Sequence, residues 1–530
     1  MQADAIRAGA LCPVTIEAAL QRTVALAPDV EAIVAPDGRR TFAELGDEVA
    51  RLRGALHAAG VRRGMHVGLC LGNGALFQAL FLALGSIGAV TVPVNTRLRS
   101  EDIAYCLSQS RVRLLITADR VLSSDFIELL GPLMNGRLPD LERVVLTSGS
   151  APWAETWQDF LSRPVTGTPE RSQAGDVILM QYTSGSTGFP KGVMLRQHAL
   201  LTNGFISAQR MGLRVADRFH SARPFFHVAG TSLSLCAALQ HGVTLVTMER
   251  FEPGEALRLM EEERCTHFSG NDTMALMLLN HPDRAARRLA LRGAWVAGAA
   301  TVLRRVVHEL GAVDCVSGYG LSEASPNIAQ SAWWETEDVR TGGLMRPQTG
   351  LEVGIFDPGT GERLPSGQKG EIRVRGWSVM SGYFDMPEKT AETLDSDGWL
   401  STGDLGSLDA QGRLAFLGRL KNIVRVGGEN VSPEEVEDIL HRHPAIRQAQ
   451  VVGVPDDRLQ EVCAAFIILN DGATLDVSQL GDWARAAMAG FKVPRHIWIV
   501  DTFEDIGMTA SAKVQKSKLA DHARRLLEQV

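Results

Sequence analysis

The chain has 530 residues, of which 45% are hydrophobic and 22% charged, and it carries a formal net charge of −7. This length is too great for one compact core, so we expect two to four structural units. The acidic balance offers no basic surface and argues against a nucleic-acid partner. The seven cysteines include no Cys-x-x-Cys pair, which indicates neither a disulfide framework nor a zinc site and fits a reducing compartment.

Two segments bear on location. The first ten residues contain one acid and one arginine and lack an apolar stretch, so they do not read as a secretory signal. Residues 74–94 are almost wholly apolar and approach the length of a membrane span. Gly85, Gly88 and Pro93 interrupt this stretch, which predicts a buried helix followed by a buried strand. We therefore expect a cytoplasmic protein without a transmembrane segment.

The first two thirds of the chain alternate strand and helix patterns. Residues 31–35, 66–71 and 112–117 read as strands, and Thr41 with Glu44 forms a capping box that opens a helix. Strands that are apolar on both faces and alternate with helices predict parallel sheets covered by helices. We expect two stacked doubly wound α/β units within about residues 1–340.

The pattern changes after Thr341. Residues 351–356 and 371–375 alternate with period two across a Pro-Gly turn, which predicts an antiparallel β-barrel or sandwich over about 341–418. Helix and strand patterns mix again beyond it. The predicted fold is α/β: a large domain, residues 1–420, of two doubly wound units plus the β-barrel, followed by a small mobile α+β domain, residues 421–530.

A loop of hydroxyls, glycines and one lysine follows the apolar run 176–181. It reads Tyr182-Thr183-Ser184-Gly185-Ser186-Thr187-Gly188-Phe189-Pro190-Lys191-Gly192. Glycines allow backbone N–H groups to turn inward, and hydroxyls and a lysine add donors and charge, so the loop suits a phosphate. The nucleoside-triphosphatase P-loop is excluded, because Gly188 is not followed by that motif's spacing before Gly-Lys-Ser/Thr.

Further motifs follow in order, and each has a plain structural interpretation as well. His227, in Pro-Phe-Phe-His, could be a core histidine, and Ala297-Gly298-Ala299-Ala300 could serve helix packing. Asp404, in Ser-Thr-Gly-Asp at an expected hairpin, could form an Asx-turn. The remaining motifs are Gly318-Tyr319-Gly320-Leu321-Ser322-Glu323, the stretch 418–431, and the stretch 507–516, whose plain interpretation is a solvated basic helix start.

These motifs, in this order over nearly the whole chain, resemble those of the adenylate-forming superfamily. Its members include acyl-CoA synthetases, luciferases and the adenylation domains of peptide synthetases. The resemblance implies that Thr183, Ser184, Gly185, Ser186, Thr187, Gly188 and Lys191 bind phosphate. It also implies that His227 lies over the acyl carboxylate.

The same resemblance implies a nucleotide site. The backbone of Gly298, Ala299 and Ala300 would lie against adenine, and Tyr319, between Gly318 and Gly320, would stack on it. Ser322 would meet the α-phosphate, Glu323 would hold magnesium together with Thr183, and Asp404 and Arg419 would bind the ribose or phosphate.

The C-terminal motifs imply a moving domain. Lys421 would be the hinge, Gly427 and Gly428 would line a pantetheine tunnel, and Lys513 would be the catalytic lysine. The sequence departs from the usual pattern at three positions: Asn422 stands where an acid is commoner, Gly507 replaces proline, and Ala512 replaces glycine.

The resemblance implies an ATP-dependent acid–CoA ligase that uses Mg²⁺ and coenzyme A. A carrier-protein-directed adenylation domain, a luciferase-type oxidase and a weakened acyl-nucleotide-binding homologue are the alternatives. The acid, whether medium-chain, cyclic or aromatic, stays open, as does a homodimer. We expect Asp272 to be a helix N-cap beside the acyl pocket, with contact to a polar group of the acid as the alternative.

Overall fold

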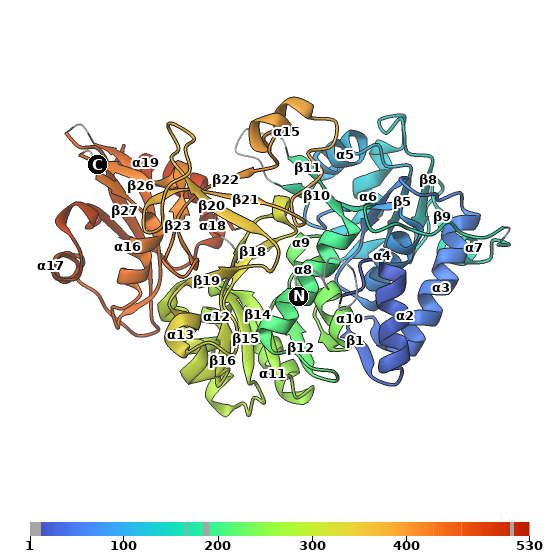
Figure 1. Cartoon of the computed structure of the whole chain (residues 1–530), viewed down its shortest axis with the longest axis horizontal. Coiled ribbons are helices and arrows are strands. Elements are labelled where there is room, and N and C mark those ends of the chain that lie inside the picture. Colours follow the sequence, from blue (N-terminus) through green and yellow to red (C-terminus); the bar gives the residue numbers. More distant parts are fainter. Residues whose placement is uncertain are drawn as a thin grey trace.

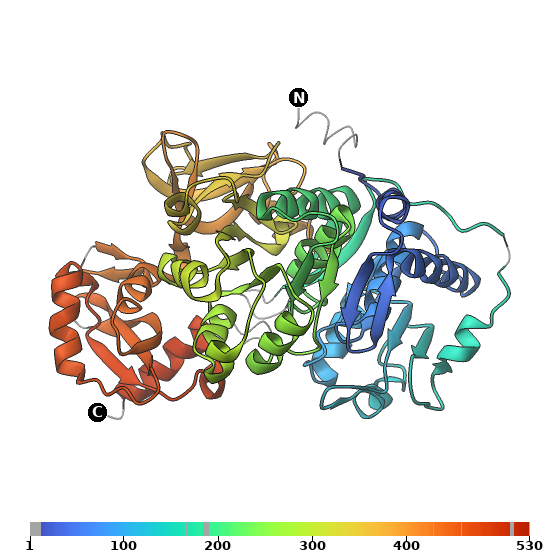
Figure 2. The same cartoon turned by 90° about the horizontal axis from the view of Figure 1, so that it is seen from below.

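The structure is a computed structural model that describes residues 12–165, 167–183, 190–427, 429–456, 458–508 and 514–528. A large body built of three sheets carries a small domain at one end (Figures 1 and 2). The two large α/β sheets lie side by side, and each has seven strands. The expected division into α/β units, an antiparallel unit and a small α+β unit is confirmed.

The sheet that carries the predicted phosphate loop is parallel except at one edge. Its order is β11-β10-β4-β3-β5-β8-β9, and β11 runs antiparallel to β10. The strands are β3 (His66–Cys70), β4 (Val90–Pro93), β5 (Leu114–Thr117), β8 (Arg143–Leu146), β9 (Glu155–Thr156), β10 (Val177–Thr183) and β11 (Lys191–Arg196). The sequence did not predict the hairpin β10–β11, because β11 is short and its apolar and polar side chains do not clearly alternate.

The second large sheet takes strands from two distant parts of the chain. Its order is β16-β15-β14-β12-β13-β1-β2. Here β1 (Glu31–Ala35) pairs in parallel with β13 and, across a hairpin, antiparallel with β2 (Gly38–Thr41). The other strands are β12 (Arg218–Ser221), β13 (Thr244–Val246), β14 (His267–Asn271), β15 (Gly293–Ala297) and β16 (Asp314–Val316).

The third sheet is antiparallel, with order β17-β18-β19-β23-β22-β21-β20. It begins at Gly318, well before the change of pattern at Thr341. Its strands are β17 (Gly318–Gly320), β18 (Asn327–Gln330), β19 (Leu344–Pro347), β20 (Glu352–Phe356), β21 (Lys369–Arg375), β22 (Leu400–Leu408) and β23 (Leu414–Arg419). Asp404 lies inside β22, so its expected place at a hairpin is wrong.

Helices cover the two large sheets on both faces, as strands apolar on both sides require. They are α2 (Ile16–Leu26), α3 (Phe42–Ala58), α4 (Ala75–Ile87), α5 (Ser100–Gln109), α6 (Phe126–Leu130), α7 (Trp157–Leu161), α8 (Gln197–Met211), α9 (Val228–Gly230), the π-helix η2 (Thr231–Cys236), α10 (Ala237–His241), α11 (Pro253–Glu262), α12 (Asp272–Leu279), α13 (Ala300–Leu310) and α14 (Glu337–Thr341). In α4, almost every residue is buried, as the apolar run 74–94 predicts.

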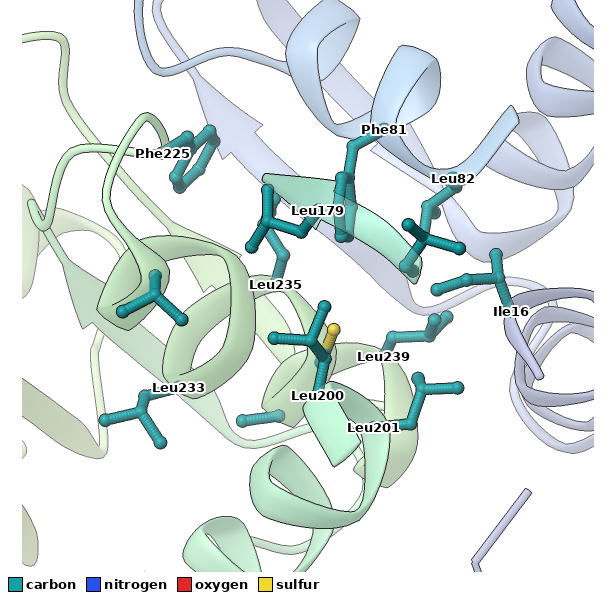
Figure 3. Packing of buried hydrophobic residues seen from close by; sticks show 14 of the residues in the cluster. Ile16, Phe81, Leu82, Leu179, Leu200, Leu201, Phe225, Leu233, Leu235 and Leu239 are labelled. Carbon is teal, nitrogen blue, oxygen red and sulfur yellow. The ribbon is translucent and has the colours of Figure 1, made fainter. Parts of the chain in front are cut away.

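A layer of helices between the two large sheets forms the largest core. Leu179 of β10 meets side chains of α4, α8, η2 and α10, with Phe225 at one end of the cluster (Figure 3). Leu200 and Leu235 are completely buried there. Burial of this kind stabilises by about 25 cal/mol per Å² of apolar surface, so this layer fixes how the two sheets face each other.

The small domain has its own sheet and two buried clusters. Strands β24 (Val424–Val426), β25 (Glu429–Val431), β26 (Ile446–Asp456), β27 (Gln460–Leu469) and β28 (His496–Ile499) carry the helices α16 (Pro433–Leu440), α17 (Val477–Ala487), α18 (Glu504–Gly507) and α19 (Lys516–Leu527). Helix α15 (Pro387–Thr393) precedes β22 in the large body.

Two expectations from composition can be followed in the structure. All seven cysteines are free and buried. Within the described ranges, no helix is both long and apolar enough to cross a membrane.

The capping box predicted at Thr41 is present. The Thr41 hydroxyl accepts a hydrogen bond from the Glu44 backbone N–H at 3.2 Å, and the Glu44 carboxylate accepts one from the Thr41 N–H at 2.8 Å. We predict that Thr41→Ala lowers the free energy of unfolding by about 0.5–2 kcal/mol, since the N-terminal N–H groups of α3 lose their acceptor. Thermal unfolding would test this, and Thr41→Ser should restore the stability. An equal loss for Ser and Ala would contradict the capping role.

Candidate active site

The predicted site residues gather where parallel strands end. The loop that carries His227 follows β12, Asp272 follows β14, Gly298 follows β15 and Gly318 follows β16. Strands in one parallel sheet present their carboxyl ends at the same edge, which is where open α/β sheets bind ligands. The predicted phosphate loop leaves the carboxyl end of β10 in the neighbouring sheet, so both sheets contribute to one region.

Several predicted residues lie outside the part of the chain that the structure describes. They are Ser184, Gly185, Ser186, Thr187, Gly188, Gly428 and Lys513. The described ends of the phosphate loop are Thr183 and Lys191, which face each other across the hairpin. The Tyr105 hydroxyl donates a hydrogen bond of 2.9 Å to the Pro190 carbonyl, so the far end of the loop is anchored to α5.

Lys191 and Glu323 are brought together by a tyrosine that the sequence did not single out. The Nζ atom of Lys191 lies 4.1 Å from the ring centroid of Tyr383, and the Tyr383 hydroxyl donates a hydrogen bond of 2.9 Å to Glu323 Oε1. Burial, reinforced by the Glu323 charge, raises the pKa of Tyr383, so the hydroxyl keeps its proton and remains a donor.

The chain segment around Tyr383 fixes this arrangement through its backbone. The Met380 N–H donates to the Glu323 carbonyl at 2.9 Å, and the Phe384 N–H donates to the Gly192 carbonyl at 2.8 Å. One short segment therefore joins Ser322–Ala324, the 3₁₀ turn that carries Glu323, to strand β11 behind the phosphate loop. The chain has only four tyrosines. Because contacts decide their roles, only Tyr319 could be found from a motif.

Tyr319, Asp404 and Arg419 form a second group. The Tyr319 hydroxyl donates a hydrogen bond of 2.7 Å to Asp404 Oδ2, and Arg419 Nε lies 2.8 Å from Asp404 Oδ1. Strands β22 and β23 set the carboxylate opposite the guanidinium by pairing the two residues in register. One face of the Tyr319 ring stacks on Phe416, with centroids 5.2 Å apart. Phe416 therefore packs against this group, and no sequence motif predicted the contact.

His227 is exposed, which argues against a core histidine. It forms the N-cap of α9, and its Nδ1 accepts a hydrogen bond from the Ala229 N–H at 3.2 Å. That bond leaves the ring on the surface of the region where the strands end. Gly230, three residues on, lies so close to the Pro224 carbonyl that a Cβ would approach its oxygen to 2.2 Å.

The predicted adenine segment is closely packed. A Cβ at Gly298 would lie 2.5 Å from the Asp272 Cβ, and one at Gly318 would lie 2.4 Å from the Trp295 ring. Real Cβ contacts of that length do not occur, so both positions require glycine for space alone. Ala299 is the N-cap of α13, and Ala300 begins that helix.

The N-cap interpretation of Asp272 is wrong. Asn271 caps α12 by accepting a hydrogen bond from the Met274 N–H at 2.8 Å, and Asp272 is the first helical residue. Burial lowers the pKa of His441, the C-cap residue of α16, and the Asp272 charge partly opposes that shift. Asp272 therefore faces the small domain as well as Gly298.

The small domain contacts the large one near these residues. The Thr301 hydroxyl donates a hydrogen bond of 3.0 Å to Asp438 Oδ1, which links α13 to α16. Lys421 is exposed in the 3₁₀ turn Leu420–Asn422, which connects β23 of the third sheet to β24 of the small domain. Gly427, with φ of 57°, follows β24.

The large body and the small domain match separate family profiles. Residues 20–384 match the profile of the AMP-binding enzyme family, and residues 435–513 match that of the AMP-binding enzyme C-terminal domain. The chain belongs to the family of AMP-binding enzymes.

Known proteins resemble the chain over almost its whole length. It is 35% identical to the putative acyl-CoA synthetase YngI of Bacillus subtilis, with 96% of each chain covered. It is 34% identical to a 3-[(3aS,4S,7aS)-7a-methyl-1,5-dioxo-octahydro-1H-inden-4-yl]propanoyl:CoA ligase of Mycobacterium tuberculosis, covering 96% of this chain and 98% of the relative.

Among solved structures, the anthranilate CoA ligase AuaEII in complex with anthranoyl-AMP superposes with a TM-score of 0.87 at 27% identity. That match covers 98% of this chain and 99% of the other. The chain is an AMP-forming acyl-CoA ligase.

The contact between Gly298 and Asp272 can be tested as a pair. We predict that Gly298→Ala destabilises the protein by about 1–3 kcal/mol, because the new methyl group overpacks the junction of β15 and α12. Adding Asp272→Gly removes the opposing Cβ, so the double variant should lose less than the sum of the two single losses. The control Gly175→Ala, where the added Cβ meets nothing within 4 Å, should leave the melting temperature nearly unchanged. Strict additivity in the cycle would contradict the packing argument.

Proposed function

We propose that the described residues divide the two half-reactions of acid–CoA ligation between them, with Mg²⁺ and coenzyme A as the partners of ATP and the acid. The observation that carries this proposal is the convergence of Lys191, from the first sheet, with Glu323 and the Tyr319–Asp404–Arg419 group, from the third sheet. A structural role alone would not require a lysine to share a tyrosine with one carboxylate, and a buried aspartate to hold a second tyrosine and an arginine, beside the predicted phosphate loop.

In the first half-reaction, a carboxylate oxygen of the acid attacks the α-phosphorus of ATP, and pyrophosphate leaves. Asp404 would hold the ribose hydroxyls and Tyr319 the adenine, with Arg419 beside them. Lys191 and the loop 184–188 would hold the phosphates, and Ser322 would meet the α-phosphate. Such chemistry is mainly positioning and charge neutralisation.

The residues around Glu323 fit a magnesium ion. Mg²⁺ keeps several waters and needs only one or two protein oxygens besides those of the phosphates. The half-buried Glu323 carboxylate is fixed by the Tyr383 hydroxyl, and Thr183 ends β10 at the start of the phosphate loop. When bound, the ion would offset charge on the departing pyrophosphate. Lys191 stacked on Tyr383 would supply a second positive charge.

The small domain supplies the rest. We expect Lys513 to approach the reacting carboxylate and α-phosphate during the first half-reaction. A turn about Lys421 would then replace it with the tunnel wall at Gly427 and Gly428. The thiol of coenzyme A, reaching through this tunnel, would attack the acyl carbonyl carbon of the acyl-AMP, and AMP would leave. Support comes from the location of Lys421 at the single connection from β23 to β24 and from the two-domain match to the family.

His227, exposed at the start of α9, would lie over the acyl carboxylate. The relatives act on different acids, since one name describes an anthranilate ligase and another a ligase of a dioxo-indenyl propanoic acid. Those names leave the acid of this chain open. The second candidate function is transfer of the acyl group to a carrier protein. A requirement for coenzyme A distinguishes acid–CoA ligation from that function.

We also propose a cytoplasmic location.

The first experiment measures both half-reactions. Pyrophosphate release that needs ATP, Mg²⁺ and an acid, followed by thioester formation with coenzyme A, is the expected activity. Lys513→Ala should slow acyl-AMP formation by about a hundredfold or more, since one charge aimed at the transition state is lost. Thioester formation from supplied acyl-AMP should survive. Equal loss of both steps, or of neither, would disprove the assignment of Lys513.

The second experiment tests the Glu323 site through its partner. Tyr383→Phe keeps the ring beneath Lys191 but removes the hydrogen bond to Glu323, so the Mg²⁺ concentration for half-maximal adenylation should rise about tenfold. Glu323→Gln should raise it as well. Tyr182→Phe is the matched control, because the Tyr182 hydroxyl donates to the Cys106 carbonyl at 3.1 Å instead. An unchanged magnesium titration for Tyr383→Phe and Glu323→Gln would leave both residues with a structural role.

A further inference from the structure

Arg223 is a buried cation whose surroundings include no described anion. Its side chain comes from the loop after β12, four residues before His227, and the residue is 8% exposed. Burial is the one cause that lowers its pKa, to about 9, and no acidic side chain within the described ranges contributes to that shift. The guanidinium therefore stays protonated at neutral pH. A buried charge without a counter-charge is costly, so this residue needs an explanation.

The neighbours of Arg223 satisfy only part of its hydrogen-bonding capacity. One amino group, Nη2, donates to the Gly270 carbonyl at 3.2 Å. The other, Nη1, is buried and meets no acceptor within the described part of the chain. The guanidinium carbon lies 4.1 Å from the ring centroid of Trp295, whose own buried Nε1–H also finds no acceptor among the described residues. Two unmatched donors thus belong to one stacked pair.

A second buried arginine shows what a purely structural role looks like in this protein. Arg210 is 7% exposed, and burial lowers its pKa to about 10. Its terminal nitrogens donate to three carbonyls, those of Gln330, Arg346 and Pro347, at 2.6–2.8 Å. Arg210 ties α8 to the third sheet. Arg223 makes one bond of this kind.

The pair also lies at the expected acyl pocket. The superfamily resemblance implies an acyl pocket formed by the segments 227–231, 270–273, 296–298 and 321–327. Gly270, which accepts from Arg223, begins the second of these segments, and Trp295 directly precedes the third. The Trp295 ring lies against Gly318 on its other side, just before Tyr319. Trp295 itself is 6% exposed and Arg223 8%, so the stacked pair is almost wholly enclosed. The apolar residues Phe225 and Val228 belong to the same buried cluster as Trp295.

We infer that Arg223 and Trp295 select an acid that carries a second oxygen acceptor, a carboxylate or a carbonyl, away from the carboxylate that is activated. This inference rests on the proposed function, since it assigns specificity within the same site. A site built to hydrogen-bond an oxygen rejects an analogue without it, because the donors are then left unpaired. A simple alkanoate would leave the guanidinium and the indole N–H without acceptors.

The test compares three acids at each of three chain lengths: six, eight and ten carbons. At each length the acids are the alkanoate, the analogue with a keto group next to its terminal methyl group, and the dicarboxylate. Acid-dependent pyrophosphate release gives kcat/KM for each. We expect the wild type to prefer a keto acid or a dicarboxylate over the alkanoate of equal length by about tenfold or more. Preference for the dicarboxylate would identify an anionic partner, and preference for the keto acid a carbonyl.

Two substitutions then assign that preference to the pair. Arg223→Gln should abolish it while leaving the KM for ATP unchanged, and Trp295→Phe, which keeps an aromatic ring without the N–H, should weaken it. Arg223→Lys keeps the charge, so it should retain more of the preference than Arg223→Gln does. This second variant keeps the test valid even where Arg223→Gln folds poorly. Arg210→Gln is the matched control: it should lower the melting temperature and leave the ranking of the acids intact.

The outcomes are distinct. If alkanoates are the best substrates and Arg223→Gln does not change the ratio, the inference is overturned while the ligase assignment stands, and Arg223 only supports the Gly270 turn. If Arg210→Gln shifts the ranking as strongly as Arg223→Gln, the inference is also overturned, since any buried arginine would then have the same effect. If neither these acids nor a matching set of cyclic and aromatic acids releases pyrophosphate from the folded wild type, the proposed function itself fails.

Discussion

The apolar helices between the two large sheets are the constraint on which the site depends. Side chains from α4, α8, η2 and α10 interdigitate with Leu179 and its neighbours (Figure 3). Close-packed interiors tolerate little sliding. The orientation of one sheet relative to the other is therefore set by this layer, and with it the distance from the phosphate loop at the end of β10 to the loops that follow β12, β14 and β15.

Polar residues complete the site by crossing between units that the core has already positioned. Tyr383 connects the first sheet to the turn at Glu323, while within the third sheet Asp404 of β22 accepts a hydrogen bond from Tyr319 of β17. Both contacts use a tyrosine hydroxyl as donor to a carboxylate, which holds the charged form in one orientation while keeping it ready for a ligand. Domain contact through Thr301 and Asp438 lies at the same edge, so the small domain can influence what binds there.

The contrast between Arg210 and Arg223 shows how hydrogen-bond satisfaction separates structure from function. Both side chains are buried and stay charged. Arg210 donates hydrogen bonds to three backbone carbonyls, whereas Arg223 donates to one. Natural proteins rarely leave buried donors unmatched, and exceptions tend to mark sites that a ligand completes. Trp295 strengthens the argument, because its N–H is unmatched in the same place.

Local patterns in the sequence determined the helices and strands, the capping box at Thr41, the buried helix within 74–94 and the motifs that mark the family. These features depend on neighbours within a few residues, so the spacing of apolar residues and the residue types at turns are enough to predict them. Tertiary structure alone decided that β1 pairs with β13, that β11 returns as a hairpin and that Asn271 rather than Asp272 caps α12. It also decided that Tyr383, Phe416 and Trp295 lie against Lys191, Tyr319 and Arg223, respectively. Strand pairing and side-chain contacts join residues far apart in the chain, and no short-range pattern encodes which distant partner a given side chain will meet.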